Sequence, residues 1–243
     1  MVSNELIENA KGLLFIWADV EAGYLAEYQK WHNCEHIPER LQIPGFLVAR
    51  RYRDIGRASG FLMFYETTSS RVMKSDAYLQ AKNNPTPWTK ETITHFSNNG
   101  RSIFGLVATE GQKPPIEAPY LVTIRFNPQT GSTKEIINWC HEEYLKNLCS
   151  IPGIYRGRLY ENDTEVSGIV TTEQRISGSR PGEHNYVVLF EISSPALLES
   201  EPWQNANKAL NDPATESPKL KDIREELYWL DFAMYAPEHH GMV

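Results

Sequence analysis

Three residues that can move protons or bind a metal lie within five positions, in the run His32-Asn33-Cys34-Glu35-His36. The spacing H-x-x-E-H can supply two zinc ligands and a general base. On a helix, His32 and His36 are four residues apart and lie on one face. A histidine so placed can also act alone as an acid or base near neutral pH. The run therefore predicts either a metal site or a proton-transfer site.

The zinc interpretation needs more than this run provides. A zinc peptidase takes a third ligand from a separate helix, and its two histidines lie within an uninterrupted helix. Pro38 follows the run at once, and a proline ends or kinks a helix. We therefore expect no metal here. We also expect His36 near the C-terminus of its helix, where the helix dipole favours the imidazolium ion.

The elements that would position these residues occur twice in the chain. Residues 31–52, WHNCEHIPERLQIPGFLVARRY, match residues 139–160, WCHEEYLKNLCSIPGIYRGRLY, residue for residue and without a gap. Strand-like runs precede and follow both segments. The runs that correspond are 13–19 with 121–127, and 61–66 with 187–192. An internal repeat of this kind predicts two copies of one structural unit.

The two copies differ at the positions that carry chemistry. Trp31 and Glu35 recur in the second copy, as do the Ile-Pro-Gly turn and the arginine and tyrosine of the strand after it. The two histidines do not recur: Cys140 replaces His32, and Tyr144 replaces His36. We infer that the shared residues are mostly scaffold. Any specific chemistry is then expected in the first copy, with the second a degenerate partner.

Each half reads strand, helix, strand, strand, helix, strand. That order is typical of a ferredoxin-like βαββαβ unit, an antiparallel sheet with two helices on one face. We expect the first unit over 12–109, a polar, proline-rich linker over 110–118, and the second unit over 119–237. One such sheet leaves a face uncovered, so the fold class expected is α+β, with both sheets packed as an intramolecular pseudo-dimeric α+β barrel. A long insertion at 161–185 in the second unit is expected to form an extra hairpin, a lid or a surface loop.

The first helix and second strand also carry a family resemblance. The run W-x-x-x-E-H-x-P, followed by P-G-F and a basic-aromatic strand within 31–52, resembles the EthD-like branch of the dimeric α+β barrel superfamily. Its members are usually single ferredoxin-like units that dimerise, so the resemblance implies a fused pair here. The superfamily includes small-molecule isomerases, lyases, polyketide cyclases, cofactor-free monooxygenases and haem enzymes. The fold alone does not choose among these activities.

We predict that His36 is the general acid or base. Its position on the helix favours this role, and the family resemblance supports it. Alternation along the second strand puts Arg51 on the side that faces the helices. A buried charge there needs a partner, so we expect Arg51 to pair with Glu35 or to hold an anionic or carbonyl group of the substrate. Glu35 or His32 would orient the base. The alternatives are a structural His36 bonded to a backbone carbonyl and a Glu35 that caps a helix or forms an ion pair.

A predicted substrate-binding set surrounds this site and consists of Trp31, Phe46, Tyr52 and Trp88. Trp88 has no counterpart in the second copy, and its ring can form one wall of a pocket for a flat apolar ligand. Trp31 and Tyr52 recur in the second copy, so packing within the core is the alternative for both. The pocket itself is expected between the sheet and the helices of the first unit.

Composition narrows the classes of partner. The chain of 243 residues is 41% hydrophobic and 23% charged, as in ordinary globular proteins. Its net charge of -7 argues against nucleic acid as a partner. No apolar run approaches the roughly 18 residues of a membrane span, and the N-terminus lacks the pattern of a signal peptide. With three cysteines and no CxxC, we expect a cytoplasmic protein with reduced thiols.

These observations together predict an enzyme that needs no cofactor, since motifs for nucleotides and flavins are missing. It would isomerise, cleave or cyclise a small apolar or aromatic compound with a carbonyl or phenol group, by proton transfer. A cofactor-free monooxygenase of a phenol or quinol is an alternative, as is a non-catalytic protein that binds small molecules. A homodimer of two such chains is compatible with this scheme.

Overall fold

The computed structural model describes residues 10–114, 116–129, 133–210 and 218–237, which divide into two compact units. Unit 1 takes in residues 1–105, 163–182 and 231–243, and unit 2 takes in 106–162 and 183–230. Two long strands, β4 (Phe96–Gly111) and β9 (Leu220–Tyr235), each begin in one unit and end in the other. Each unit is therefore built from more than one stretch of the chain.

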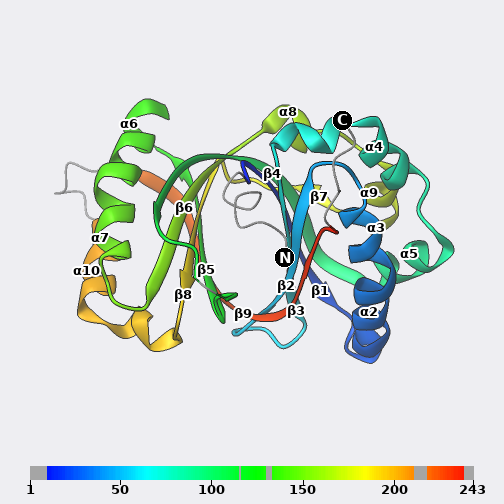
Figure 1. Cartoon of the computed structure of the whole chain (residues 1–243), viewed down its shortest axis with the longest axis horizontal. Coiled ribbons are helices and arrows are strands. Elements are labelled where there is room, and N and C mark those ends of the chain that lie inside the picture. The colour runs from blue at the N-terminus through cyan, green and yellow to red at the C-terminus, as the bar shows by residue number, and fades with distance from the viewer. Residues whose placement is uncertain (1–9, 115, 130–132, 211–217, 238–243) are drawn as a thin grey trace. The chain divides into compact units, whose positions relative to one another are not determined.

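Unit 1 contains an antiparallel sheet in the order β4-β1-β3-β2, which is the strand order of a ferredoxin-like sheet. Its first three strands are β1 (Gly12–Val20), β2 (Phe46–Asp54) and β3 (Gly60–Thr67). Its helices are α2 (Leu25–Trp31), α3 (Ile37–Leu41), α4 (Asp76–Asn83) and α5 (Pro87–Thr92). Figure 1 shows the blue helices α2 and α3 and the teal helices α4 and α5 on one side of this sheet.

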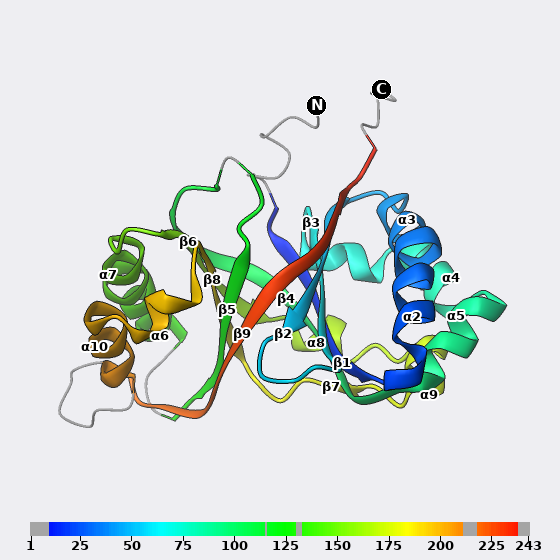
Figure 2. The same cartoon turned by 90° about the horizontal axis from the view of Figure 1, so that it is seen from below.

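Unit 2 repeats the pattern with the strand order β9-β5-β8-β6. Its remaining strands are β5 (Tyr120–Pro128), β6 (Ile154–Asn162) and β8 (Tyr186–Ile192). Its helices are α6 (Thr133–Trp139), α7 (Lys146–Cys149) and α10 (Glu201–Ala209), and Figure 2 shows all three along one face of the strands. The order of strands and helices predicted for each half is therefore observed in each unit.

Strand pairing corrects the sequence alignment of one strand of the repeat. Val48 of β2 pairs with Glu66 of β3, and Arg156 of β6 pairs with Glu191 of β8. Since Val48 and Arg156 are equivalent in the repeat, the two glutamates are equivalent too. The third strand of unit 2 therefore matches one residue earlier than the sequence comparison predicts. A shift of one residue matters because it moves every side chain to the opposite face of the sheet.

The helix that carries the histidines is continuous from Leu25 to Leu41. A π-helical turn over His32–His36 joins α2 to α3, and the Ile37 amide donates to the His32 carbonyl. Of the two expected effects of Pro38, an end or a kink of the helix, the end is not observed. Pro38 lies directly after the π-helical turn, as the second residue of α3. The equivalent helix of unit 2 has a π-helical turn in the same place, and such turns are frequent at functional sites.

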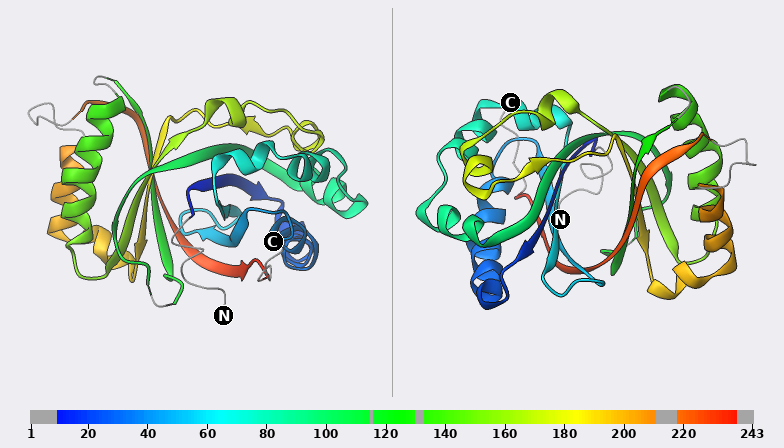
Figure 3. Two further views of the ribbon diagram at one scale, coloured as in Figure 1. Left: turned by 45° about the horizontal axis from the view of Figure 1, so that its top comes forward. Right: turned by 180° about the vertical axis from the view of Figure 1, so that it is seen from behind.

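The insertion of the second half belongs to unit 1. It forms two short helices, α8 (Thr164–Ser167) and α9 (Thr172–Ser177), and the two-residue strand β7 (Arg180–Pro181), instead of the expected hairpin. β7 pairs in parallel with β4, and Figure 3 shows the yellow insertion running beside the teal segment of unit 1. A capping box formed by Thr171 and Gln174 starts α9.

A compact apolar core lies between the sheet and the helices of each unit. In unit 1 it includes Trp31, Phe46, Met63 and Tyr65, all nearly inaccessible to solvent. The turn before β2 depends on Gly45, whose φ of +94° lies in the left-handed region, as expected for a glycine that follows proline. Among the described residues, no helix is both long enough and apolar enough to cross a membrane.

Candidate functional site

A pocket lies between the sheet and the helices of unit 1, and the insertion forms one of its walls. It holds about 470 Å³ of space not filled by protein atoms, part of it open to solvent. The residues that line it are Ile16, Trp31, His36, Met63, Lys82, Ile93, Phe96, Asn99, Arg101, Glu173, Gln174, Ser177 and Ser179. Of the residues predicted for the site, Trp31 and His36 are in this lining.

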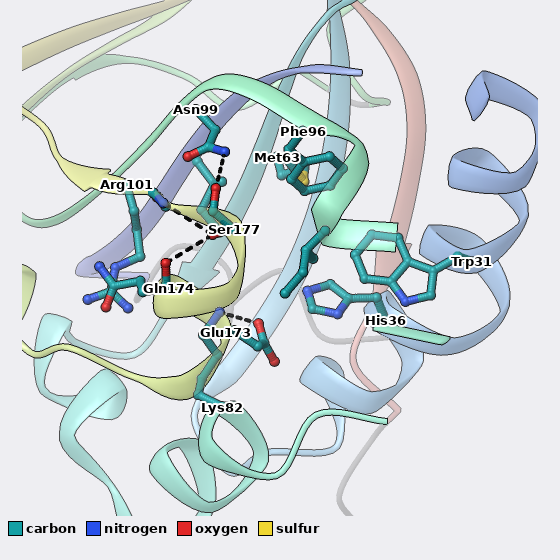
Figure 4. Close-up of a pocket in the computed structure, with 13 residues that line it drawn as sticks. Trp31, His36, Met63, Lys82, Phe96, Asn99, Arg101, Glu173, Gln174 and Ser177 are labelled. Atoms are coloured by element: carbon teal, nitrogen blue, oxygen red, sulfur yellow. Dashed lines mark hydrogen bonds and ion pairs between the residues drawn. The ribbon is translucent and has the colours of Figure 1, made fainter. Parts of the chain in front are cut away.

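His36 lies on the wall of the pocket with 5% of its surface exposed. Its ring packs against the Trp31 indole, with the ring centroids 4.4 Å apart and the planes 32° apart (Figure 4). Its Nδ1 atom is buried and has no hydrogen-bond partner among the described residues. Burial lowers the pKa of His36 well below its ordinary value, and the nearby Arg40, His32 and Lys82 lower it further. The expected position near a helix C-terminus is therefore wrong, because His36 lies in mid-helix, where burial and the nearby cations disfavour the imidazolium.

Glu35 is held by two threonines. Its Oε1 atom accepts hydrogen bonds from Thr86 Oγ1 at 2.6 Å and from Thr89 Oγ1 at 3.1 Å. Thr89 Oγ1 also accepts a hydrogen bond from Nε1 of Trp31 at 3.1 Å. The structure thus links the two residues that both copies share, Trp31 and Glu35, to the start of α5. The expected pairing of Glu35 with Arg51 is not observed.

Arg51 faces the helices, as strand alternation predicts, but it lies outside the pocket lining. Its Nε donates to Asp231 Oδ2 at 2.7 Å, and its Nη1 donates to Asn33 Oδ1 at 2.8 Å. Nη1 also lies 3.3 Å from Nδ1 of His32, whose Nε2 is 3.1 Å from the Tyr65 hydroxyl. Burial, followed by Arg51, lowers the pKa of His32 well below its ordinary value. His32 is therefore a neutral ring with both nitrogens engaged by the protein.

This polar chain is confined to unit 1. At the equivalent positions unit 2 has Val107 for Asp231, Leu159 for Arg51, Cys140 for His32 and Phe190 for Tyr65, as the repeat and the strand registers show. At the position of His36, unit 2 has Tyr144, which is buried, stacks on Trp139 with centroids 5.2 Å apart and donates to Asn207 Oδ1 at 2.6 Å. Unit 2 therefore places a fully bonded tyrosine where unit 1 places the pocket histidine.

The comparison of the two copies missed a buried ion cluster beside His36. Glu173 of α9 forms ion pairs with both Arg40 of α3 and Lys82 of α4. All three side chains are buried, and the two cations hold the pKa of Glu173 below its ordinary value despite its burial. One signal was present in the sequence, because Arg40 corresponds to the buried Leu148 of the second copy. The cluster ties the insertion to the helices of unit 1.

The other residues of the predicted substrate-binding set lie outside the pocket lining, and of them only Phe46 belongs to the core between the sheet and the helices of unit 1. Phe46 stacks on Tyr78, with centroids 5.9 Å apart, and Tyr52 packs edge-on against Phe64 at 6.1 Å. Trp88 is partly buried, and the Lys30 ammonium lies 5.5 Å from the centre of its ring. In the parts of the chain that the structure describes, no group of three His, Cys, Asp or Glu side chains is placed to hold a metal ion.

The fold of this chain is shared with other solved structures. The chain matches solved structures along nearly its whole length but at identities near 10%, so the likeness concerns the fold alone. These neighbours share the fold and do not single out a family, the EthD-like branch included. No protein-family model matches the sequence, and no curated protein matches it.

Three of these solved structures are informative. A candidate monooxygenase from Fusobacterium nucleatum has a TM-score of 0.59 at 10% identity, covering 93% of this chain and 95% of its own. An anthrone oxidase-like protein has a TM-score of 0.57 at 11% identity, covering 96% and 97%. A mutant chlorite dismutase from Candidatus Nitrospira defluvii has a TM-score of 0.52 at 9% identity, covering 90% and 92%.

Proposed function

We propose that this protein is a small-molecule enzyme in which neutral His36 takes a proton from a flat, largely apolar substrate bound in the pocket of unit 1. One observation carries the proposal: a buried imidazole lines a pocket beside Trp31 and Phe96 and has a ring nitrogen without a hydrogen-bond partner among the described residues. A base must be neutral before it can accept a proton, and the lowered pKa of His36 keeps it neutral at pH 7. Trp31 fixes the plane of the ring.

The proton transfer balances without any further reagent. A C–H or O–H bond of the substrate breaks, an N–H bond forms on His36, and the electron pair stays on the substrate as an enolate or phenolate. Arg40 and Lys82 disfavour the imidazolium, so His36 returns the proton readily. If His36 returns the proton to a different carbon, the product is an isomer. If His36 gives the proton to a leaving group, the reaction is an elimination. The same scheme serves an isomerase, a lyase or a cyclase.

A second candidate is a cofactor-free monooxygenase. In that reaction the carbanion or phenolate formed by His36 reacts with O₂, which is then a second substrate. The names of two structural neighbours, a candidate monooxygenase and an anthrone oxidase-like protein, support this candidate, although only the fold is shared. In both candidates the two units act as a fused pair in which unit 1 carries the site, and a cytoplasmic location remains our prediction.

The test is hydrogen–deuterium exchange into carbon acids. Anthrone and the smaller 2-tetralone each have acidic CH₂ protons, whose exchange in D₂O under nitrogen is followed by NMR with and without the purified protein. We expect the protein to accelerate exchange of at least one compound, and His36→Ala to lower that rate about 10²- to 10⁴-fold. His95→Ala is the matched control, because His95 belongs to unit 1 but lies outside the pocket lining. Equal rates with wild type and His36→Ala would overturn the proposal.

Admitting oxygen separates the two candidates. Oxygen uptake that depends on both the carbon acid and His36, with an oxygenated product by mass spectrometry, would establish the monooxygenase. Exchange without oxygen uptake would favour the isomerase, lyase or cyclase. Saturable binding with neither exchange nor oxygen uptake would leave a non-catalytic binding protein and contradict both candidates.

A further inference from the structure

The pocket of unit 1 has more buried positive charge around it than buried negative charge. Lys82, Arg101 and Glu173 line it, and Arg40 is ion-paired to Glu173. All four side chains are more than nine-tenths buried. Glu173 is the only fully buried carboxylate in this group, and Glu39, 3.6 Å from Arg40, is only partly buried. Three cations thus face two carboxylates, in a protein whose net charge is -7.

Arg101 accounts for the unmatched charge. Its Nη2 donates to the backbone carbonyls of Ser167 at 3.3 Å and Ile169 at 2.9 Å, which are neutral acceptors. No carboxylate of the described residues forms an ion pair with it, and its Nε is buried without a hydrogen-bond partner there. Lys82 has three N–H donors, one of which is directed to Glu173. A buried charge is costly unless an opposite charge accompanies it.

Several polar atoms of the pocket also lack partners. Buried atoms without a hydrogen bond among the described residues include His36 Nδ1, Asn99 Oδ1, Arg101 Nε and Ser179 Oγ, and all four residues line the pocket. Leaving such an atom unpaired in a buried site destabilises the protein. Water can satisfy hydrogen bonds, but it cannot neutralise the excess cation. A ligand that carries one negative charge does both.

Apart from Gln174 and Ser177, the remaining lining is apolar and partly aromatic. Ile16, Trp31, Met63, Ile93 and Phe96 supply it, and such surfaces favour a flat ring. Figure 4 shows Trp31 and His36 on one side of the pocket, whereas Lys82 and Arg101 come from other elements across it. An occupant with an apolar ring at one end and an anionic group at the other matches this division.

We propose that the pocket of unit 1 binds an aromatic carboxylate with one negative charge, whose carboxylate meets Lys82 and Arg101 and whose ring lies against Trp31 and Phe96. This inference deepens the proposed function, on which it rests for its catalytic meaning, by naming the class of substrate. The carboxylate identifies the substrate and holds it, while His36 reaches an acidic C–H or O–H elsewhere on the molecule. The negative charge also offsets the repulsion between the imidazolium formed on His36 and its cationic neighbours.

Binding of two probes tests this inference without any turnover. Benzoate and benzamide have nearly the same shape, and only benzoate carries a charge at pH 7.5. Isothermal titration calorimetry of the full chain should show benzoate binding about 10- to 100-fold more tightly, the range for a charge-assisted hydrogen bond in a buried site. Equal affinities for the two probes, or no binding of either, would overturn the inference.

Variants then locate the preference. Lys82→Met should abolish the preference for benzoate, whereas Lys82→Arg, which keeps the charge, should retain it. Lys90→Met is the matched control, because Lys90 is exposed on α5 and its loss changes the net charge equally. If circular dichroism shows that Lys82→Met does not fold, the affinities of wild type and Arg101→Lys for benzoate and benzamide still test the inference. A preference that persists in folded Lys82→Met would contradict the assignment.

The failure of this inference can be told apart from failure of the proposed function. His36→Ala removes the base and leaves Lys82 and Arg101 in place, so it should keep the benzoate preference. Loss of exchange activity with this preference intact is the pattern expected if both proposals hold. A benzoate preference in a protein without any His36-dependent exchange would sink the enzyme proposal alone. His36-dependent exchange with equal affinity for the two probes would sink the carboxylate proposal alone.

Discussion

Arg51 donates a hydrogen bond from Nη1 to Nδ1 of His32 across 3.3 Å. A guanidinium can only donate, so this nitrogen of His32 carries no proton. The proton is then on Nε2, which donates to the Tyr65 hydroxyl at 3.1 Å. The His32 ring lies against that of His36, with the centroids 5.8 Å apart. Of the two histidines, one has both nitrogens engaged, whereas the other has a nitrogen for which the described residues offer no partner.

The buried pair Arg51–Asp231 should be replaceable by the apolar residues found at the equivalent positions of unit 2. Arg51→Leu alone leaves Asp231 without its closest cation and should lower the free energy of unfolding by about 3 kcal/mol. The double variant Arg51→Leu/Asp231→Val should recover much of that loss, because no charge is then left unpaired. Urea unfolding of wild type, both single variants and the double variant measures the coupling. If the losses of unfolding free energy in the two single variants simply add in the double variant, the predicted coupling is contradicted.

Glu35 is expected to act on structure and not on turnover. Glu35→Gln keeps an oxygen that can accept from Thr86 and Thr89, so stability should change little. Glu35→Ala removes that acceptor and should lower the free energy of unfolding by about 1–3 kcal/mol. In the carbon-acid exchange assay, Glu35→Gln should stay within a few-fold of wild type. A loss of about 10²-fold or more would instead make Glu35 part of the proton-transfer machinery.

Acid should destabilise the fold through the two buried histidines. The pKa values of His32 and His36 are depressed in the folded state, so below the ordinary value near 6.5 the unfolded chain binds more protons than the folded one. Stability is therefore complete above pH 6.5 and is lost as the pH falls below it, by about 1.4 kcal/mol per pH unit for each histidine. Urea unfolding from pH 7.5 to 5.0 measures this slope.

The variant His36→Asn supplies the control for that slope. It removes one of the two depressed histidines and should halve the dependence between pH 6.5 and 5.0. His95 contributes to the pH dependence of stability with the opposite sign, because hydrogen bonding to Glu21 raises its pKa. His95→Asn should therefore not flatten the dependence of stability on pH. A wild-type stability that does not change over this window would show that neither buried histidine resists protonation.

Much of the fold could be predicted from the sequence, because the two copies of the repeat can be compared with each other. The repeat predicted the order of strands and helices in both units. It also separated Trp31 and Glu35, which are linked through Thr89, from the two histidines of the first copy. Alternation placed Arg51 on the correct face of its strand. These predictions rest on local periodicity, which the chain expresses over a few residues.

The partners of the buried charges could not be predicted from the sequence, because long-range packing determines them. Arg40 and Lys82 meet a glutamate that is 133 and 91 residues away in sequence, within an insertion whose form no periodicity indicated. The continuous helix was missed for a different reason. A π-helical turn has no sequence pattern of its own, and Pro38 suggested a helix end or kink, whereas the helix continues past it to Leu41.

Glu173 should be the residue that fixes the insertion to unit 1, and its exposed neighbour Glu165 offers a matched comparison. Glu173 is buried and pairs with Arg40 and Lys82, whereas Glu165 of α8 is 62% exposed and pairs with Lys74. Glu173→Gln removes the buried counter-charge of both cations, leaving only the partly buried Glu39 at 3.6 Å from Arg40, and should lower the free energy of unfolding by about 3–5 kcal/mol. Glu165→Gln should leave it unchanged, because an exposed ion pair is screened by solvent. Urea unfolding compares the two variants, and hydrogen exchange should report earlier opening of 164–177 in Glu173→Gln alone. Equal stability of the two variants would mean that the buried cluster does not hold the insertion in place.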